Sequence, residues 1–142
     1  MKLQEVANHY FGTLCLRVGP DGVGRLQNSI LIDKNSQLPC SRTESYHTVA
    51  RGQMSVNCRI TQTATRELDP DFVRVIWSGD LGPFPADRPP NMEIRVTYRY
   101  DVNQVMHCEF EDVTSGLRQS VDLGVEHGGE IPQASPDRFV VE

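Results

Sequence analysis

Histidine and cysteine are the residues of this chain best suited to metal or thiol chemistry. The 142 residues contain four of each type, namely His9, His47, His107, His127, Cys15, Cys40, Cys58 and Cys108. A zinc site needs ligands in closely spaced pairs, such as CxxC or HxxxH. The close pair here is His107 and Cys108, and neighbours in a strand point to opposite faces, so they cannot share one ion. We therefore predict no metal site, and we expect the cysteines to be reduced, buried and structural.

Acidic residues are the second candidate for chemistry. Glu109 and Glu111 lie two positions apart, so they share one face of a strand and would be placed to act as an acid–base couple. Charged residues on a solvent-facing strand give the same pattern, and we favour that interpretation. The chain has no GxSxG, Walker A or dinucleotide motif, and residues 19–25, GPDGVGR, lack the GK[ST] of a phosphate-binding loop. We predict that the protein is not an enzyme.

Length and charge restrict the class of protein further. A chain of 142 residues, 38% hydrophobic and 23% charged, has the size and composition of one globular domain. Its net charge of −5 argues against nucleic acid or an anionic membrane as a partner. No stretch approaches the ~20 apolar residues of a membrane span, and the N-terminal residues contain no apolar signal core. These features predict a cytoplasmic protein.

Alternation of apolar and polar residues with a period of two is the main structural pattern, and it predicts strands. Residues 93–100 and 105–111 alternate on either side of a short polar break, which predicts a hairpin. Arg51-Gly52 reads as a two-residue hairpin turn between two further strands. No ten-residue window has helical spacing. The remaining strand-like segments are 13–18, 28–32, 44–50, 53–63, 72–77 and 117–123, and together they predict an antiparallel β-sandwich.

The pattern also divides the chain. We predict a linker-like N-terminus over residues 1–9, the sandwich over residues 10–125 and a flexible tail over residues 126–142. The tail is broken by glycine and proline and ends near the apolar trio Phe139-Val140-Val141.

Residues 30–39, ILIDKNSQLP, resemble a segment of the substrate-binding β-sandwich of the seventy-kilodalton heat-shock chaperones (the DnaK type). In that family an apolar strand, a Lys-Asn turn and an aliphatic-Pro pair follow one another. Four further segments resemble the same domain in the same order, and the likeness runs over roughly residues 6–125. They are Tyr10-Phe11-Gly12 at its opening, ESYHTV with GQMSVNCRITQ beside its peptide groove, and PPNMEIRVTYRYDVNQVMHCEFEDVTSG as its last long hairpin.

The resemblance implies a fold and a function. The fold would be all-β, the antiparallel sandwich of a DnaK-type peptide-binding domain, in a divergent bacterial homologue. Such a domain holds extended, apolar-centred polypeptide segments in a groove. By position, Val56, Cys58 and Val105 match the wall of its pocket and Tyr46 the aromatic residue beneath it. Val49, with Leu16 or another apolar residue of the first hairpin, matches the arch over the peptide. A groove would also explain why Val105 is apolar, although it shares a strand face with His107, Glu109 and Glu111.

The chain also departs from the family. Neither the nucleotide-binding domain nor the helical lid of the family is found in these residues. We therefore expect no cofactor in this chain, because in the family ATP acts through the nucleotide-binding domain. The implied partners are unfolded or extended polypeptide segments and an upstream nucleotide-binding domain. The tail, with its apolar trio, is a candidate ligand for the groove of its own or a neighbouring molecule, which would cause self-association. An alternative is a structural or docking sandwich that has no peptide groove and contacts a fixed protein partner.

Overall fold

The computed structural model describes residues 5–124 and 129–130. Within them the chain forms strands joined by turns and one 3-10 turn, η1 (Pro70–Phe72). The strands are β1 (Tyr10–Val18), β2 (Gly24–Ile32), β3 (Cys40–His47), β4 (Val56–Thr63), β5 (Arg74–Leu81), β6 (Glu93–Tyr100), β7 (Met106–Asp112), β8 (Arg118–Gly124) and β9 (Gly129–Glu130). No helix in the described part is long and apolar enough to cross a membrane.

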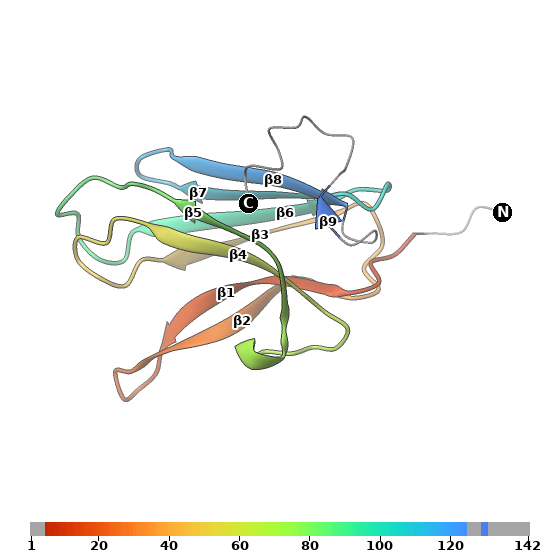
Figure 1. Ribbon diagram of the computed structural model, residues 1–142, viewed down its shortest axis with the longest axis horizontal. Helices are drawn as coiled ribbons and strands as arrows, with labels where there is room; N and C mark the ends of the chain where they lie inside the picture. The colour runs from red at the N-terminus through yellow and green to blue at the C-terminus, as the bar shows by residue number, and fades with distance from the viewer. Residues whose placement is uncertain (1–4, 125–128, 131–142) are drawn as a thin grey trace.

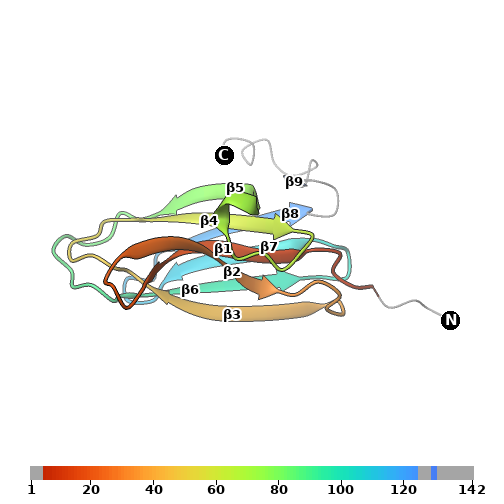
Figure 2. The same ribbon diagram turned by 90° about the horizontal axis from the view of Figure 1, so that it is seen from below.

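The strands form two antiparallel sheets that pack face to face. One has the order β2-β1-β4-β5 and the other the order β3-β6-β7-β8-β9. Figure 2 shows β4 and β5 in one layer above β3 and β6 in the other. The predicted all-β antiparallel sandwich is therefore confirmed. Figure 1 shows that the β1–β2 hairpin projects beyond the body of the sandwich.

The core follows the alternation of the long hairpin. Tyr98, Tyr100, Met106 and Phe110 point between the sheets, and each is at most 1% exposed. The hydroxyl of Tyr98 donates a hydrogen bond of 2.7 Å to the carbonyl of Gly12 in the opposite sheet. A side chain at Gly12 would come within 2.2 Å of the Ser29 carbonyl oxygen, so glycine is required where β1 approaches β2. The Tyr98 bond therefore joins the two layers, while Gly12 allows β1 and β2 to pair closely within one layer.

The turn at Arg51-Gly52 is correct, but the hairpin predicted around it is wrong. Gly52 has the positive φ of 73° that the turn requires. The strands on its two sides nevertheless lie in different sheets, because β3 pairs with β6 whereas β4 pairs with β1 and β5. The residues between β3 and β4 therefore cross from one layer to the other. The hydrophobic alternation of the two segments is compatible both with a β3–β4 hairpin and with strands in separate sheets. It therefore could not distinguish the two arrangements.

A buried ion pair between Arg88 and Asp112 helps to hold the β3–β4 connection in place. The guanidinium of Arg88 donates two hydrogen bonds of 2.8 Å to the carboxylate of Asp112, and these side chains are 7% and 0% exposed. The Arg88 guanidinium also lies 3.9 Å from the ring centre of Phe84. The backbone carbonyl of Arg88 accepts a hydrogen bond from Gly52 N–H. The pair thus links the end of β7, through the β5–β6 loop, to the β3–β4 connection.

The two ends of the chain contact the sandwich where they are described. Ala7, in the segment predicted as linker-like, is fully buried, and Val6 forms a bridge with Gln37. Gly129 and Glu130 pair with Gly124 and Leu123 at the edge of β8. The rest of the predicted tail, residues 126–128 and 131–142, lies outside the described residues, as does residue 125 at the end of the predicted sandwich.

Candidate functional site

An open cavity of about 650 Å³ lies where strands β1 and β4 of the four-stranded sheet separate. β1 pairs with β4 from Tyr10 to Thr13 only, and its partners there run from Thr63 to Ile60. Past that point β1 continues to Val18, while the first residues of β4 lie opposite it without pairing. Thr13 marks the separation, since its hydroxyl donates a hydrogen bond of 2.7 Å to the carbonyl of Arg59. The cavity therefore results from the divergence of two neighbouring strands.

The divergence leaves backbone without strand partners on both sides of the cavity. Residues 14–18 of β1 pair with β2 along one edge only, and residues 56–59 of β4 pair with β5 along one edge only. Among the described residues the other edge of each segment has no ladder partner. Free strand edges present N–H and C=O groups that an added extended chain can bind. The cavity is therefore bounded by two edges suited to a peptide backbone.

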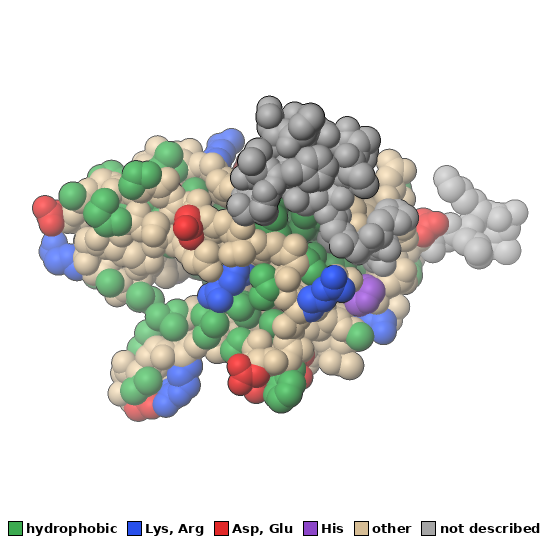
Figure 3. Space-filling model, viewed as in Figure 1, with side chains coloured by type: hydrophobic (Ala, Val, Ile, Leu, Met, Phe, Trp, Pro, Cys, Tyr) green, Lys and Arg blue, Asp and Glu red, His purple; other side chains and the backbone are tan. Residues whose placement is uncertain are grey.

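The cavity has an apolar floor and a mixed rim. Its floor is the inner face of the five-stranded sheet, where Ile94, Val96 and Phe110 are each at most 3% exposed. The rim comes from the projecting hairpin and from the β3–β4 connection, and Figure 3 shows a notch between these parts of the surface. The notch opens the cavity to the surrounding solution, while the side chains of the floor remain almost completely covered.

Five of the six residues predicted for the peptide groove line this one cavity. Leu16 and Val49, predicted as an arch, are both 46% exposed at its rim. Val56 and Cys58 line it from β4, and Cys58 is 2% exposed. Tyr46 lines it from β3. Their role in binding a peptide remains a prediction.

Val105 is placed differently from the other five. It lies in the turn between β6 and β7 and is not among the described residues that line the cavity. Its N–H donates to the Asp101 carboxylate at 3.1 Å, and its carbonyl accepts from Asp101 N–H. Val105 therefore does not line this cavity beside Val56, and it belongs to the β6–β7 turn. Its role in binding a peptide remains a prediction.

Polar partners account for the other face of β7. His107 lies between two carboxylates, with Nδ1 2.7 Å from Asp122 and Nε2 2.8 Å from Asp101. Glu109 and Glu111 both lie within 4 Å of the Arg118 guanidinium, as expected of a charged surface. In residues 5–124 and 129–130, no three His, Cys, Asp or Glu side chains are placed to hold a metal ion.

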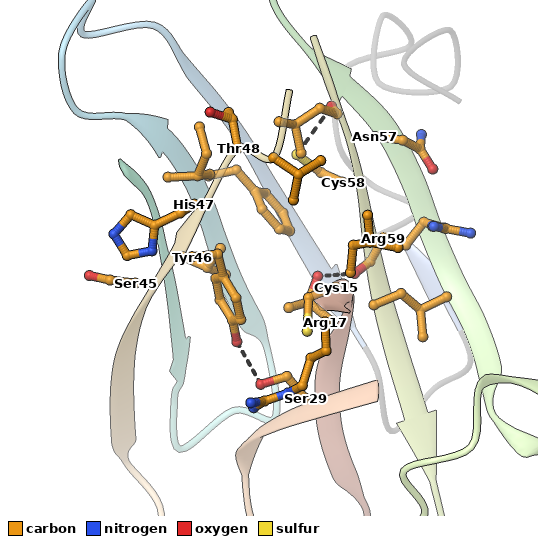
Figure 4. Close-up of a pocket in the computed structure, with 18 of the residues that line it drawn as sticks. Cys15, Arg17, Ser29, Ser45, Tyr46, His47, Thr48, Asn57, Cys58 and Arg59 are labelled. Carbon is orange, nitrogen blue, oxygen red and sulfur yellow. Dashed lines mark hydrogen bonds between the residues drawn. The ribbon is translucent and has the colours of Figure 1, made fainter. Parts of the chain in front are cut away.

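Hydrogen bonding and burial define the chemistry inside the cavity. The hydroxyl groups of Tyr46 and Ser29 lie 2.8 Å apart and connect the edges of the two sheets. Burial raises the pKa of Tyr46 to about 12 and that of Cys58 to about 12. Burial also raises the pKa of Cys15. Thiols and phenol are therefore neutral near pH 7 and act as apolar or hydrogen-bonding surface (Figure 4).

Several lining residues were not predicted from the sequence. Phe110, Ile94 and Val96 belong to the two alternating segments, and they pack in the core and also form the cavity floor. Ser29 and Arg17 carried no signal, because serine and arginine are ordinary residues on a strand. Ser29 and Arg17 could be identified as lining residues only once the point at which β1 and β4 diverge was known.

The fold and the cavity define a class of protein: a β-sandwich with a cleft that has an apolar floor and is bounded by free strand edges. Comparison with known proteins gives a narrower result. The chain is 28% identical over 127 residues to chaperone protein HscA homologs of Herminiimonas arsenicoxydans, Janthinobacterium sp. (strain Marseille) and Azotobacter vinelandii. The match covers 87% of this chain but 20% of each relative, so the chain spans about a fifth of their length. No family model matches. The matches support a relationship to the seventy-kilodalton heat-shock chaperone family.

Proposed function

We propose that this chain is a client-holding module of a chaperone, which binds extended, apolar-centred polypeptide segments in the cavity. The observation that carries the proposal is the pair of unpaired strand edges, residues 14–18 and 56–59, that flank an apolar floor. A peptide backbone would bond to an edge while one aliphatic side chain enters the space beside Val56. Binding of this kind depends on the backbone more than on side-chain identity, so it is broad in specificity. The module acts by binding and needs neither a catalytic group nor a cofactor of its own.

Titration of a fluorescent leucine-centred heptapeptide with uncharged flanks tests this proposal. We expect saturable binding, and N-methylation of two backbone amides is expected to weaken it roughly tenfold or more. Each lost hydrogen bond accounts for about 0.5–1.5 kcal/mol. Equal affinity of the two peptides would contradict backbone pairing. No saturable binding of either would favour the alternative, a docking sandwich that contacts a fixed protein partner.

We also propose that the tail competes for this cavity. The segment Arg138–Val141 combines a cation with three apolar residues, and a tethered ligand has an effective concentration on the order of millimolar. Phe139 follows Glu130 by nine residues, an extended reach of about 30 Å. Deletion of residues 134–142 is therefore expected to increase affinity for added peptide and to reduce self-association. Sedimentation and peptide titration measure the two effects, with Phe139→Asp as a matched single substitution. If neither quantity changes, the tail does not occupy the cavity.

A further inference from the structure

The charged side chains that line the cavity differ in whether a nearby residue of opposite charge pairs with them. The permanently charged lining residues are Arg17, Glu44 and Arg59. The carboxylate of Glu44 is bonded to the guanidinium of Arg42, so its charge is already paired. The guanidinium of Arg59 points away from the cavity in Figure 4. Arg17 is therefore the charge most available to a ligand.

Arg17 differs from the arginine directly opposite it on the hairpin. In the register of β1 and β2, Arg17 faces Arg25. Arg25 forms an ion pair of 2.8 Å with Asp21 at the hairpin tip. Arg17 makes no ion pair with any carboxylate in the described part of the chain, and it lies on the segment of β1 whose inner edge is unpaired. An uncompensated cation thus stands beside the proposed peptide path, in a protein whose net charge is −5.

We propose that Arg17 is a specificity-determining residue, which makes the cavity prefer extended segments with an acidic residue next to their apolar centre. This inference rests on the proposed function. A guanidinium binds a carboxylate through two parallel hydrogen bonds. Arg17 is exposed at the rim of the cavity, so such a pair would be partly screened by water and by salt. A lysine in the same position of the ligand would instead be repelled.

The tail carries charges of both signs around its apolar trio. Phe139-Val140-Val141 is preceded by Asp137-Arg138 and followed by Glu142. Arg17 would attract the carboxylate of Glu142 and would repel Arg138, which lies directly next to Phe139. The tail, proposed above for its cation and its apolar trio, therefore does not itself represent the preferred acidic flank on both sides.

Three heptapeptides that share one leucine centre but have glutamate, glutamine or lysine flanks test the inference on the full chain. Fluorescence anisotropy in ~50 mM salt is expected to rank them glutamate, glutamine, lysine, with roughly five- to tenfold between the extremes. Arg17→Gln is expected to remove the ranking. Arg25→Gln is the matched control, since it removes the opposite arginine, which does not line the cavity, and is expected to preserve the ranking. Raising salt to ~500 mM should reduce the difference.

The outcomes separate this inference from the function on which it rests. Saturable binding of all three peptides with equal affinity, or with lysine first, overturns the inference and leaves the proposed function standing. Loss of the ranking in Arg25→Gln as well as in Arg17→Gln overturns the assignment to Arg17. No binding of any peptide overturns both. Circular dichroism of each variant establishes that a change in affinity is not loss of fold.

Discussion

Replacement of Asp112 by alanine is expected to lower the free energy of unfolding by about 3–5 kcal/mol. The change would leave the guanidinium of Arg88 buried without its counter-charge, and removing one partner of a buried pair costs more than the pair contributes. Arg88 and Asp112 are 7% and 0% exposed, and two hydrogen bonds of 2.8 Å join them. Urea unfolding followed by the fluorescence of Trp77, the single tryptophan, measures the loss.

The matched control is Asp33→Ala, which removes one partner of an exposed pair. Asp33 lies 2.7 Å from Arg66, and both side chains are more than half exposed, so a loss below about 1 kcal/mol is expected. Replacing both buried partners, as in Arg88→Met with Asp112→Leu, should recover much of the loss, because no unpaired charge remains. Equal, small losses in Asp112→Ala and Asp33→Ala would contradict the proposed importance of burial.

The same pair makes stability depend on pH. The Arg88 guanidinium, followed by hydrogen bonds from Ser115, lowers the pKa of Asp112 below its ordinary value despite burial. A carboxyl whose pKa is lower in the folded state stabilises the fold above its unfolded pKa of about 3.9. That contribution is lost as the pH falls through the lower folded pKa. In Asp112→Ala this component of the acid dependence should be absent, which unfolding curves between about pH 2 and pH 6 would show.

Val56→Asp is expected to weaken peptide binding by at least about a hundredfold while the sandwich stays folded. Val56 lines the cavity and is only partly buried, so the carboxylate can reach water when the cavity is empty. A bound apolar side chain would exclude that water, and a desolvated, unpaired carboxylate costs several kcal/mol. Anisotropy titration together with circular dichroism measures both quantities.

Val75→Asp is the control for the same chemical change elsewhere in that sheet. Val75 lies in β5, is 43% exposed and does not line the cavity, so neither binding nor fold should change. An unfolded Val56→Asp protein would show that Val56 serves the core, whereas unchanged affinity in a folded variant would show that peptides bind elsewhere. Either result would remove Val56 from the proposed site.

Sequence reasoning was most successful where a short-range pattern determines the structure. The alternation at 93–100 and 105–111 predicted two strands and a hairpin, which the structure contains as β6 and β7. Tyr98 and Phe110, from its apolar positions, are buried. It failed at the β3–β4 connection, where the choice between a hairpin and a crossing depends on distant partners. Strand β3 pairs with β6 along its whole length, and nothing within residues 44–63 encodes that choice.

The candidate site shows the same limit. Leu16, Tyr46, Val49, Val56 and Cys58 were assigned by resemblance and line one cavity. Val105 was assigned by the same resemblance, yet it lies in the β6–β7 turn, where its backbone bonds to Asp101. Which face a strand residue occupies is local information. How far along the strand the site lies is determined by the packing of the whole sandwich.

The divergence of β1 and β4 also has a kinetic consequence. The contacts that define it join distant parts of the chain, because Thr13 bonds to Arg59 46 residues away and Tyr98 bonds to Gly12 86 residues away. Folds dominated by such non-local contacts form in about milliseconds to seconds, more slowly than helical bundles. The cavity walls come from both sheets, so no single hairpin can form them ahead of the rest. During that interval the newly made chain exposes the same free edges and apolar segments that, once folded, it is proposed to bind in others.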